Sequence, residues 1–286
     1  IKLKNIFLLL FILIPLSLIT GPAIPDLTIT FGGIFVLIWI FFKEKNYKII
    51  NNNFIQISII FWFSLIFISF FSFNKITSFQ ESFIFLRYLL IPICCYYLFF
   101  NEKNIFYYLV FIVFILVVFV SIDTLYQFYN YTSKNGFGSD ILGFKSEWYG
   151  RLTGPFGDEL IPGAYLSKFG LIGFVYLLIN KNFKSKIFLQ SIYLSIIQIA
   201  CFASGERMAF ATYTLALILL LIFLNKYRTV FLLSIIIGLV SIFTIYKLHP
   251  FYNDYEIIES NEYHQGLKIE KNFECDNDSS NRCTKI

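Results

Sequence analysis

Apolar residues occur in long runs along this chain, and short polar or charged segments separate the runs. A hydrocarbon core about 30 Å thick is crossed by about 20 helical residues, so each run of similar length predicts one membrane span. We therefore expect an all-α polytopic membrane protein with about nine transmembrane helices. The predicted spans are residues 5–20, 27–42, 54–73, 82–100, 105–122, 161–179, 187–203, 208–224 and 229–246.

The first apolar run has two interpretations. Lys2 and Lys4 precede roughly 15 apolar residues, as they do in a secretory signal peptide. The next segment reads GPAIP and is a poor cleavage site, so we favour a retained first helix. Pro22 and Pro25 then turn the chain after that helix.

Basic residues gather in alternate connections between the predicted spans, which places those connections and the N-terminus in the cytoplasm. Two external segments are too long to be simple turns. We therefore expect a transmembrane helical domain at residues 1–246, which includes an external loop at 123–160, and an external loop or tail at 247–286. The residues that set this orientation are Lys43, Lys45, Lys48, Lys103, Lys181, Lys184, Lys186, Lys226 and Arg228.

The composition agrees with a membrane protein, because 57% of the 286 residues are hydrophobic and only 14% are charged. The mean hydropathy is +0.70, a balance that excludes an ordinary soluble domain of this size. The chain also contains 37 Phe and 19 Tyr. We expect most of the Phe side chains to face lipid and not to form a platform for sugar rings.

The predicted spans contain almost no carboxylate, which argues against one class of membrane protein. Carriers coupled to protons or sodium ions generally need acidic residues or broken helices near the middle of the membrane. Here Asp158, Glu159 and Glu206 all lie at the predicted external edge. The chain also lacks the sequence repeat that marks the inverted halves of many transporters.

Four cations are predicted to meet near the external interface, namely Arg87, Arg151, Lys168 and Arg207. A charge held close to hydrocarbon costs roughly 2.5–3.5 kcal/mol, so it usually has a function. Arg binds phosphate oxygens with two parallel hydrogen bonds, and Lys supplies a mobile point charge. The pattern predicts an anion-binding site. The alternative is that each side chain extends to lipid headgroups or pairs with a neighbour, as Glu206 would with Arg207.

Two short segments carry a family resemblance. Residues 150–169 read GRLTGPFGDELIPGAYLSKF and end the long external loop. Residues 203–210 read ASGERMAF and join two predicted spans through a turn that Gly205 permits. This pairing resembles the O-antigen ligase and O-antigen polymerase-like membrane proteins. The chain looks like a C-terminally truncated member of that family, and over the rest of its length the resemblance is one of topology.

The resemblance implies a metal-independent glycosyltransferase with a glycosyltransferase-C-like helical bundle and no cofactor. Such a protein would act at the periplasmic face of the bacterial cytoplasmic (inner) membrane, in lipopolysaccharide biosynthesis. Its donor would be a glycan linked to undecaprenyl diphosphate, and its acceptor would be lipid A core or a growing glycan chain. By matching position Arg207 would contact the diphosphate, with Arg151, Lys168 and Arg87 as further diphosphate-binding candidates. Membrane lipids are expected partners, and nucleic acid is not.

Transfer also requires a base within hydrogen-bonding distance of the acceptor hydroxyl. The family's functional histidine lies in a second large external loop, and neither His249 nor His264 resembles that motif. We expect both histidines to be ordinary polar loop residues. Asp158 and Glu159 are then the candidate catalytic bases, and the alternative is that they cap the first turn of the following helix.

Two further sequence patterns are not expected to form a catalytic site. Residues 276–278 match the D-x-D pattern of metal-dependent sugar-nucleotide transferases but lack its strand context, so we expect no metal there. The chain also contains five cysteines. Cysteines within spans are expected to pack as small apolar residues, and those in the external tail are candidates for a disulfide. The first group is Cys94, Cys95 and Cys201, and the second is Cys275 and Cys283.

Two functions from other classes remain open at this stage. A transporter or flippase of polyisoprenoid-linked sugars would need a polar pathway to both leaflets, whereas the predicted cations lie near one face. A non-catalytic membrane scaffold predicts instead that all four cations face lipid headgroups and share no pocket.

Overall fold

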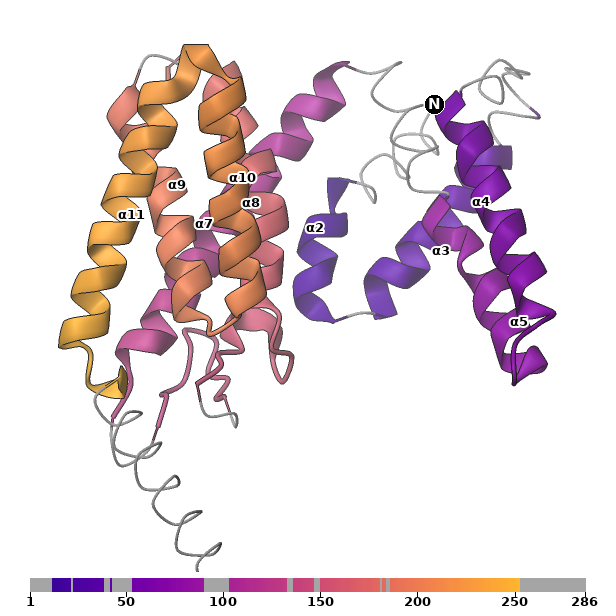
Figure 1. The fold of residues 1–286 in the computed structure, drawn as a ribbon, viewed down its shortest axis with the longest axis horizontal. Helices are drawn as coiled ribbons and strands as arrows, with labels where there is room; N and C mark the ends of the chain where they lie inside the picture. Colours follow the sequence, from indigo (N-terminus) through magenta and orange to yellow (C-terminus); the bar gives the residue numbers. More distant parts are fainter. Residues whose placement is uncertain are drawn as a thin grey trace, which may run out of the picture. The chain divides into compact units, whose positions relative to one another are not determined.

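The computed structural model describes residues 12–21, 23–38, 42, 53–89, 103–132, 136–146, 150–180, 182–183 and 186–252. These residues are mostly helical and form no strand, which confirms the predicted all-α character. Figure 1 labels the α-helices, whose bounds are α2 (Ile14–Ser17), α3 (Ala23–Ile38), α4 (Asn53–Ser69), α5 (Lys75–Ile84), α7 (Lys103–Tyr129), α8 (Pro162–Ile179), α9 (Ile187–Ala203), α10 (Arg207–Phe223) and α11 (Arg228–Leu248). The 3-10 helices are η1 (Leu18–Thr20), η4 (Gly154–Phe156) and η5 (Asn225–Tyr227).

Helices α8, α9, α10 and α11 begin and end close to the limits predicted from the apolar runs. Helix α7 differs, because it continues to Tyr129 and includes residues that we expected in the external loop. Asp123 and Gln127 in these last turns are fully buried. They remain helical because the loop supplies hydrogen-bond donors, from the Ile141 N–H to Asp123 Oδ1 at 2.8 Å and from the Gly154 N–H to Gln127 Oε1 at 2.9 Å.

Three helical segments are long and apolar enough to cross a membrane, which indicates a membrane protein. They are Phe106–Tyr129, Pro162–Ile179 and Asn225–Leu248. Shorter apolar helices occur at Ala23–Phe35, Ile55–Ser69, Ile187–Ala203 and Arg207–Phe223. The part of the chain that the structure describes therefore does not support nine spans. Parts of the predicted spans 5–20, 27–42 and 82–100 lie outside it.

Most of the predicted span 54–73 is helix α4, which forms a helical hairpin with α5, and residues 90–100 of the predicted span 82–100 lie outside the described residues. Helix α4 ends at Ser69, and the chain reverses into α5, which has only 10 residues. Ser69 Oγ lies 2.6 Å from Ser82 Oγ, and the Trp62 indole N–H donates to the Ser82 carbonyl at 2.9 Å. These polar contacts hold the two helices together, and α5 is too short to cross a bilayer.

The first of two compact units consists of Ile1–Val120 and Tyr165–Ile197. Within it, α8 and α9 pack closely. A Cβ at Gly173 would lie 2.2 Å from the Tyr193 hydroxyl, and the Tyr193 ring stacks on Phe114 with centroids 5.2 Å apart. A side chain at Gly173 would therefore displace the Tyr193 ring, so glycine permits this packing.

The second compact unit consists of Ser121–Ala164 and Gln198–Ile286. The long loop packs against the ends of the helices in this unit, and the Leu152 N–H donates to the Ser204 carbonyl at 3.1 Å. The loop therefore contributes to a hydrophobic core and is not a free surface segment. The buried residues of this core are Phe128, Tyr131, Phe137, Leu152, Ala203, Ile245 and Phe251.

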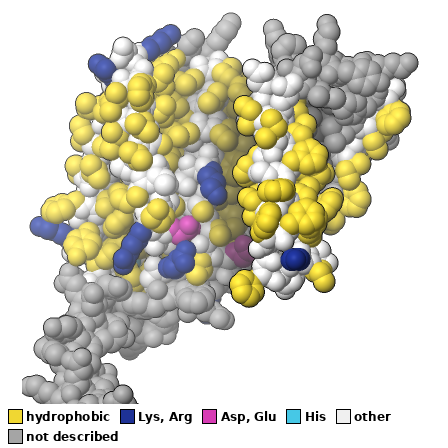
Figure 2. All heavy atoms as spheres, turned by 45° about the vertical axis from the view of Figure 1, so that its right-hand side comes forward, with side chains coloured by type: hydrophobic (Ala, Val, Ile, Leu, Met, Phe, Trp, Pro, Cys, Tyr) yellow, Lys and Arg dark blue, Asp and Glu magenta, His cyan; other side chains and the backbone are white. Residues whose placement is uncertain are grey.

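Hydrophobic side chains cover most of the visible surface of the described residues in Figure 2. On α10 and α11, for example, Met208 is 76% exposed, Phe223 is 75% exposed and Phe243 is 60% exposed. Water would penalise such a surface, but a bilayer accommodates it. Exposed Phe side chains such as these are the kind that we expected from the sequence to face lipid.

Candidate functional site

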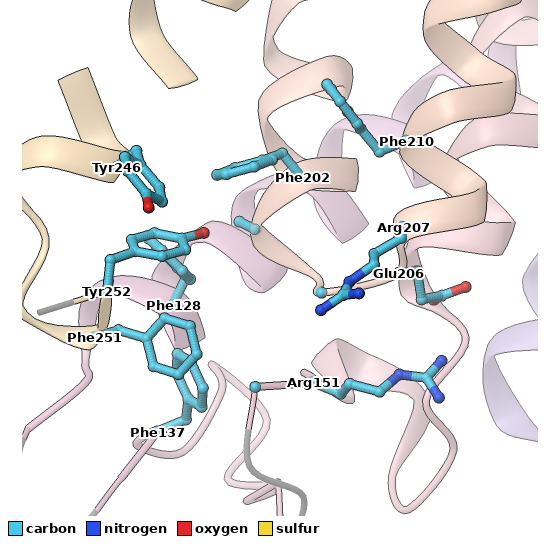
Figure 3. A pocket seen from close by; sticks show the side chains of 13 residues that line it. Phe128, Phe137, Arg151, Phe202, Glu206, Arg207, Phe210, Tyr246, Phe251 and Tyr252 are labelled. Atoms are coloured by element: carbon cyan, nitrogen blue, oxygen red, sulfur yellow. The ribbon is translucent and has the colours of Figure 1, made fainter. Parts of the chain in front are cut away.

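The second unit contains a cavity of about 710 Å³, which Figure 3 shows from close by. Its wall combines positive charge from Arg151 and Arg207 with a group of aromatic rings. The lining residues are Phe128, Phe137, Gly150, Arg151, Phe202, Ala203, Gly205, Glu206, Arg207, Phe210, Tyr246, Phe251 and Tyr252. The structure thus brings together two of the four predicted cations.

Arg207 is the first residue of α10 and directly follows the turn from α9. Gly205 forms this turn with a φ of +77°, in the left-handed region that favours glycine. A Cβ at this position would lie 2.0 Å from the Gly150 carbonyl oxygen. The prediction that Gly205 permits the turn is therefore confirmed, and contact with the loop fixes where Arg207 begins its helix.

Glu206 connects the same turn to the start of α8. Its Oε1 accepts the Gly163 N–H at 2.9 Å, and its Oε2 accepts the Ala164 N–H at 3.1 Å. The first N–H groups of a helix have no partner within the helix, so this carboxylate caps α8 from another part of the chain. Figure 3 shows the Glu206 side chain directed away from Arg207, which differs from the pairing considered above.

Replacing Glu206 by alanine is expected to lower the free energy of unfolding by about 1–3 kcal/mol, because two partly buried N–H groups lose their acceptor. Glu206→Gln keeps one acceptor oxygen and should lose roughly half as much. Thermal unfolding of the detergent-purified protein measures both changes. Glu159→Ala is the matched control, because Glu159 is exposed and its loss is expected to cost less than about 0.5 kcal/mol. Equal melting temperatures for the Ala variants would contradict the capping role.

Arg151 reaches the cavity from the long loop. Its guanidinium donates to the Leu160 carbonyl at 3.2 Å, and its own carbonyl accepts the Ser146 hydroxyl. In Figure 3 the Arg151 side chain extends away from the aromatic rings, while the Arg207 guanidinium lies between them and Arg151. Arg151 and Arg207, from separate segments of the chain, therefore both line one cavity.

The aromatic side of the cavity was not predicted from the sequence. Tyr252 stacks on Phe202 with ring centroids 5.9 Å apart and contacts Tyr246 at 4.9 Å. Phe137 and Phe251 lie 5.0 Å apart. These rings line the cavity, whereas we expected from the sequence that most Phe side chains face lipid. The rings come from distant parts of the sequence, so no local pattern marks them.

Arg87 and Lys168 are not among the residues that line the cavity. Arg87 forms an ion pair with Asp26 at 3.0 Å and donates to the Tyr88 hydroxyl at 2.8 Å. Its charge is therefore compensated by neighbouring side chains. Lys168 is an exposed residue of α8.

The candidate bases Asp158 and Glu159 are exposed in the segment between η4 and α8, and neither lines the cavity. The Glu159 N–H donates to the Phe156 carbonyl at 3.3 Å. Capping of α8 was the alternative role for these carboxylates, and the N–H groups of Gly163 and Ala164 are bound by Glu206 instead.

His249 is not the ordinary polar loop residue that we expected. It is only 7% exposed, and its ring stacks on Phe128 with centroids 4.1 Å apart. Burial lowers the pKa of His249, so the ring is neutral at pH 7, and its Nδ1 accepts the Phe251 N–H at 3.3 Å. Because Phe128 and Phe251 both line the cavity, His249 packs against side chains that form the cavity wall.

Cys201 is free and buried, as expected of a small apolar residue, and its Sγ lies 3.7 Å from the Gly163 carbonyl oxygen. The predictions for the second histidine, the D-x-D pattern and the other four cysteines fall outside the described residues. These residues are His264, 276–278, Cys94, Cys95, Cys275 and Cys283.

The two segments that carry the family resemblance are in direct contact. Leu152 in the first segment donates its N–H to Ser204 in the second, and Glu206 in the second binds the N–H groups of Gly163 and Ala164 in the first. No protein-family model, curated protein or solved structure matches the chain.

Proposed function

We propose that this protein is a membrane glycosyltransferase that moves an oligosaccharide from undecaprenyl diphosphate to lipid A core or to a growing glycan chain. The reaction takes place at the periplasmic face of the bacterial inner membrane, within a glycosyltransferase-C-like bundle of about nine spans. The observation that carries the proposal is the cavity in which the two resemblance segments meet and present Arg151 and Arg207 together.

The charged side of the cavity suits a diphosphate. Each guanidinium group can bind phosphate oxygens with two parallel hydrogen bonds. Arg207 also stands at the N-terminus of a helix of 17 residues, where the helix dipole favours negative charge. Both features attract the same anion, and neither requires a metal ion.

The aromatic side suits the groups attached to that diphosphate. Rings such as Phe251 and Tyr252 bind the apolar faces of sugars or the first isoprene units. A cavity of about 710 Å³ lies within the usual range of roughly 300–1,000 Å³ for small-molecule sites. It therefore has room for a diphosphate and an adjoining sugar.

In the proposed reaction an acceptor hydroxyl attacks the anomeric carbon, and the bond from that carbon to the diphosphate oxygen breaks. Negative charge grows on the departing diphosphate, and Arg207 and Arg151 stabilise it because they are already in position. Asp158 or Glu159, which lie outside the cavity lining, is proposed as the base that accepts the proton of the acceptor.

The test is a transfer assay in lipid nanodiscs with a labelled oligosaccharide on a short polyprenyl diphosphate and lipid A core as acceptor. We expect label on the acceptor and release of polyprenyl diphosphate. A parallel assay in sealed liposomes follows movement of the intact lipid-linked sugar between leaflets. Movement without cleavage would show a flippase and contradict the transferase. If the protein neither transfers the label nor moves the lipid-linked sugar, both functions are excluded.

A further inference from the structure

A pair of buried carboxylates joins the end of α7 to the loop that follows it. Asp123 has 0% exposed surface and Asp140 is 4% exposed. Each uses one oxygen to accept a main-chain N–H, from Ile141 to Asp123 Oδ1 at 2.8 Å and from Phe144 to Asp140 Oδ1 at 2.6 Å. Neither residue lines the cavity with the arginines.

The second oxygen of each carboxylate is buried and has no hydrogen-bond partner among the described residues. The carboxyl group of Asp140 lies within hydrogen-bonding reach of that of Asp123, so two acceptors lie close together, and no described residue donates to their second oxygens. Among the described residues, the ion pair between Arg87 and Asp26 involves neither of these two carboxylates. Unpaired buried carboxylates are too costly to persist, so this pair requires a positively charged species.

The hydrogen bonds around the pair suit a bound cation. A main-chain N–H that donates to a carboxylate stabilises its charged form, and both aspartates receive such a bond. A further oxygen faces the same place. A Cβ at Gly154 would lie 3.0 Å from Thr124 Oγ1 and 3.7 Å from Asp123 Oδ2, so both oxygens point at one stretch of backbone.

We propose that Asp123 and Asp140 bind a hard divalent cation, Ca²⁺ or Mg²⁺, that fastens the loop to the end of α7. The neighbouring side-chain ligands are all oxygen atoms, which such cations prefer, and no sulfur or nitrogen ligand is involved. The role is structural and independent of the proposed transfer reaction, because the pair does not border the cavity.

The test measures the melting temperature of the full chain, purified in detergent and stripped with EDTA, during titration with CaCl₂ or MgCl₂. At a hundredfold excess over the dissociation constant, we expect the melting temperature to rise by roughly 5–10 °C. Equilibrium dialysis with radioactive calcium provides a direct binding measurement on the native chain. In Asp140→Asn the affinity should fall at least about tenfold, because the charge is lost while Oδ1 still accepts the Phe144 N–H.

Asp158→Asn is the matched control, since it removes one exposed carboxylate and should leave the calcium response unchanged. Two results would overturn the proposal. One is a native protein whose melting temperature responds to neither cation, and the other is an equal response in Asp140→Asn. A melting temperature that falls steadily from pH 5 to pH 8 with no cation dependence would likewise overturn it and identify a shared proton. If Asp140→Asn does not fold, calcium bound to the native chain in dialysis but lost in Asp123→Asn supports the site, and no bound calcium overturns it.

Discussion

Replacing Arg207 by alanine is expected to weaken binding of a polyprenyl diphosphate by about a hundredfold, because a charged hydrogen-bond donor is removed from a preformed site. The transfer rate should fall by a similar or larger factor, since charge on the diphosphate grows as the bond breaks. Arg207→Lys keeps the charge but loses the planar pair of donors, so it should recover only part of the loss. Calorimetric titration of the nanodisc-embedded protein with a short polyprenyl diphosphate measures the affinity.

Arg228→Ala provides the control for this experiment. Like Arg207, Arg228 is the first residue of a long helix, but it does not line the cavity, and its guanidinium donates to the Leu221 and Ile222 carbonyls. Its loss should leave diphosphate affinity within about twofold of the native value. Equal losses in the two variants, at unchanged melting temperature, would mean that Arg207 contributes only general surface charge.

The second large effect is expected from Gly205→Ala. An alanine at a φ of +77° costs roughly 1–2 kcal/mol by itself. In addition its Cβ would lie 2.0 Å from the Gly150 carbonyl oxygen, which is backbone and cannot rotate away. We therefore expect the free energy of unfolding to fall by more than about 3 kcal/mol, and Arg207 to move relative to the loop. Thermal unfolding and diphosphate binding should both report the change.

Gly136→Ala measures the cost of the left-handed backbone without the steric clash. Gly136 has a φ of +70°, but a Cβ there would meet nothing within 4 Å. It should therefore show only the backbone cost of roughly 1–2 kcal/mol and retain diphosphate binding. If the two variants lose equal stability, the close approach between Gly205 and Gly150 is not important for the fold.

The C-terminal helices could be predicted from the sequence because one physical requirement determines them. An apolar run that ends in a short polar turn must form its backbone hydrogen bonds internally, so the ends of the run become the ends of the helix. Helices α8 to α11 follow this rule. The hairpin of α4 and α5 does not, because contacts such as Ser69 with Ser82 join residues that were predicted to lie in two different spans.

The site could be predicted only where its residues are close together in the sequence. The turn that carries Gly205 and Arg207 is visible in a few letters, because glycine and a charged residue stand out between apolar runs. The aromatic wall is not visible in this way. The residues next to Phe137 and Tyr252 in the sequence form no recognisable motif. These two side chains reach one cavity only because the loop packs on the helix ends.

The capping of α8 by Glu206 has a consequence for biosynthesis. The acceptor lies 43 residues after the Gly163 N–H that it binds, so the ribosome must translate the whole of α8 and α9 before the cap exists. Until then the first turn of α8 has polar groups that water or the insertion machinery must solvate. The cap on α8 therefore forms only after the turn before α10 has been synthesised.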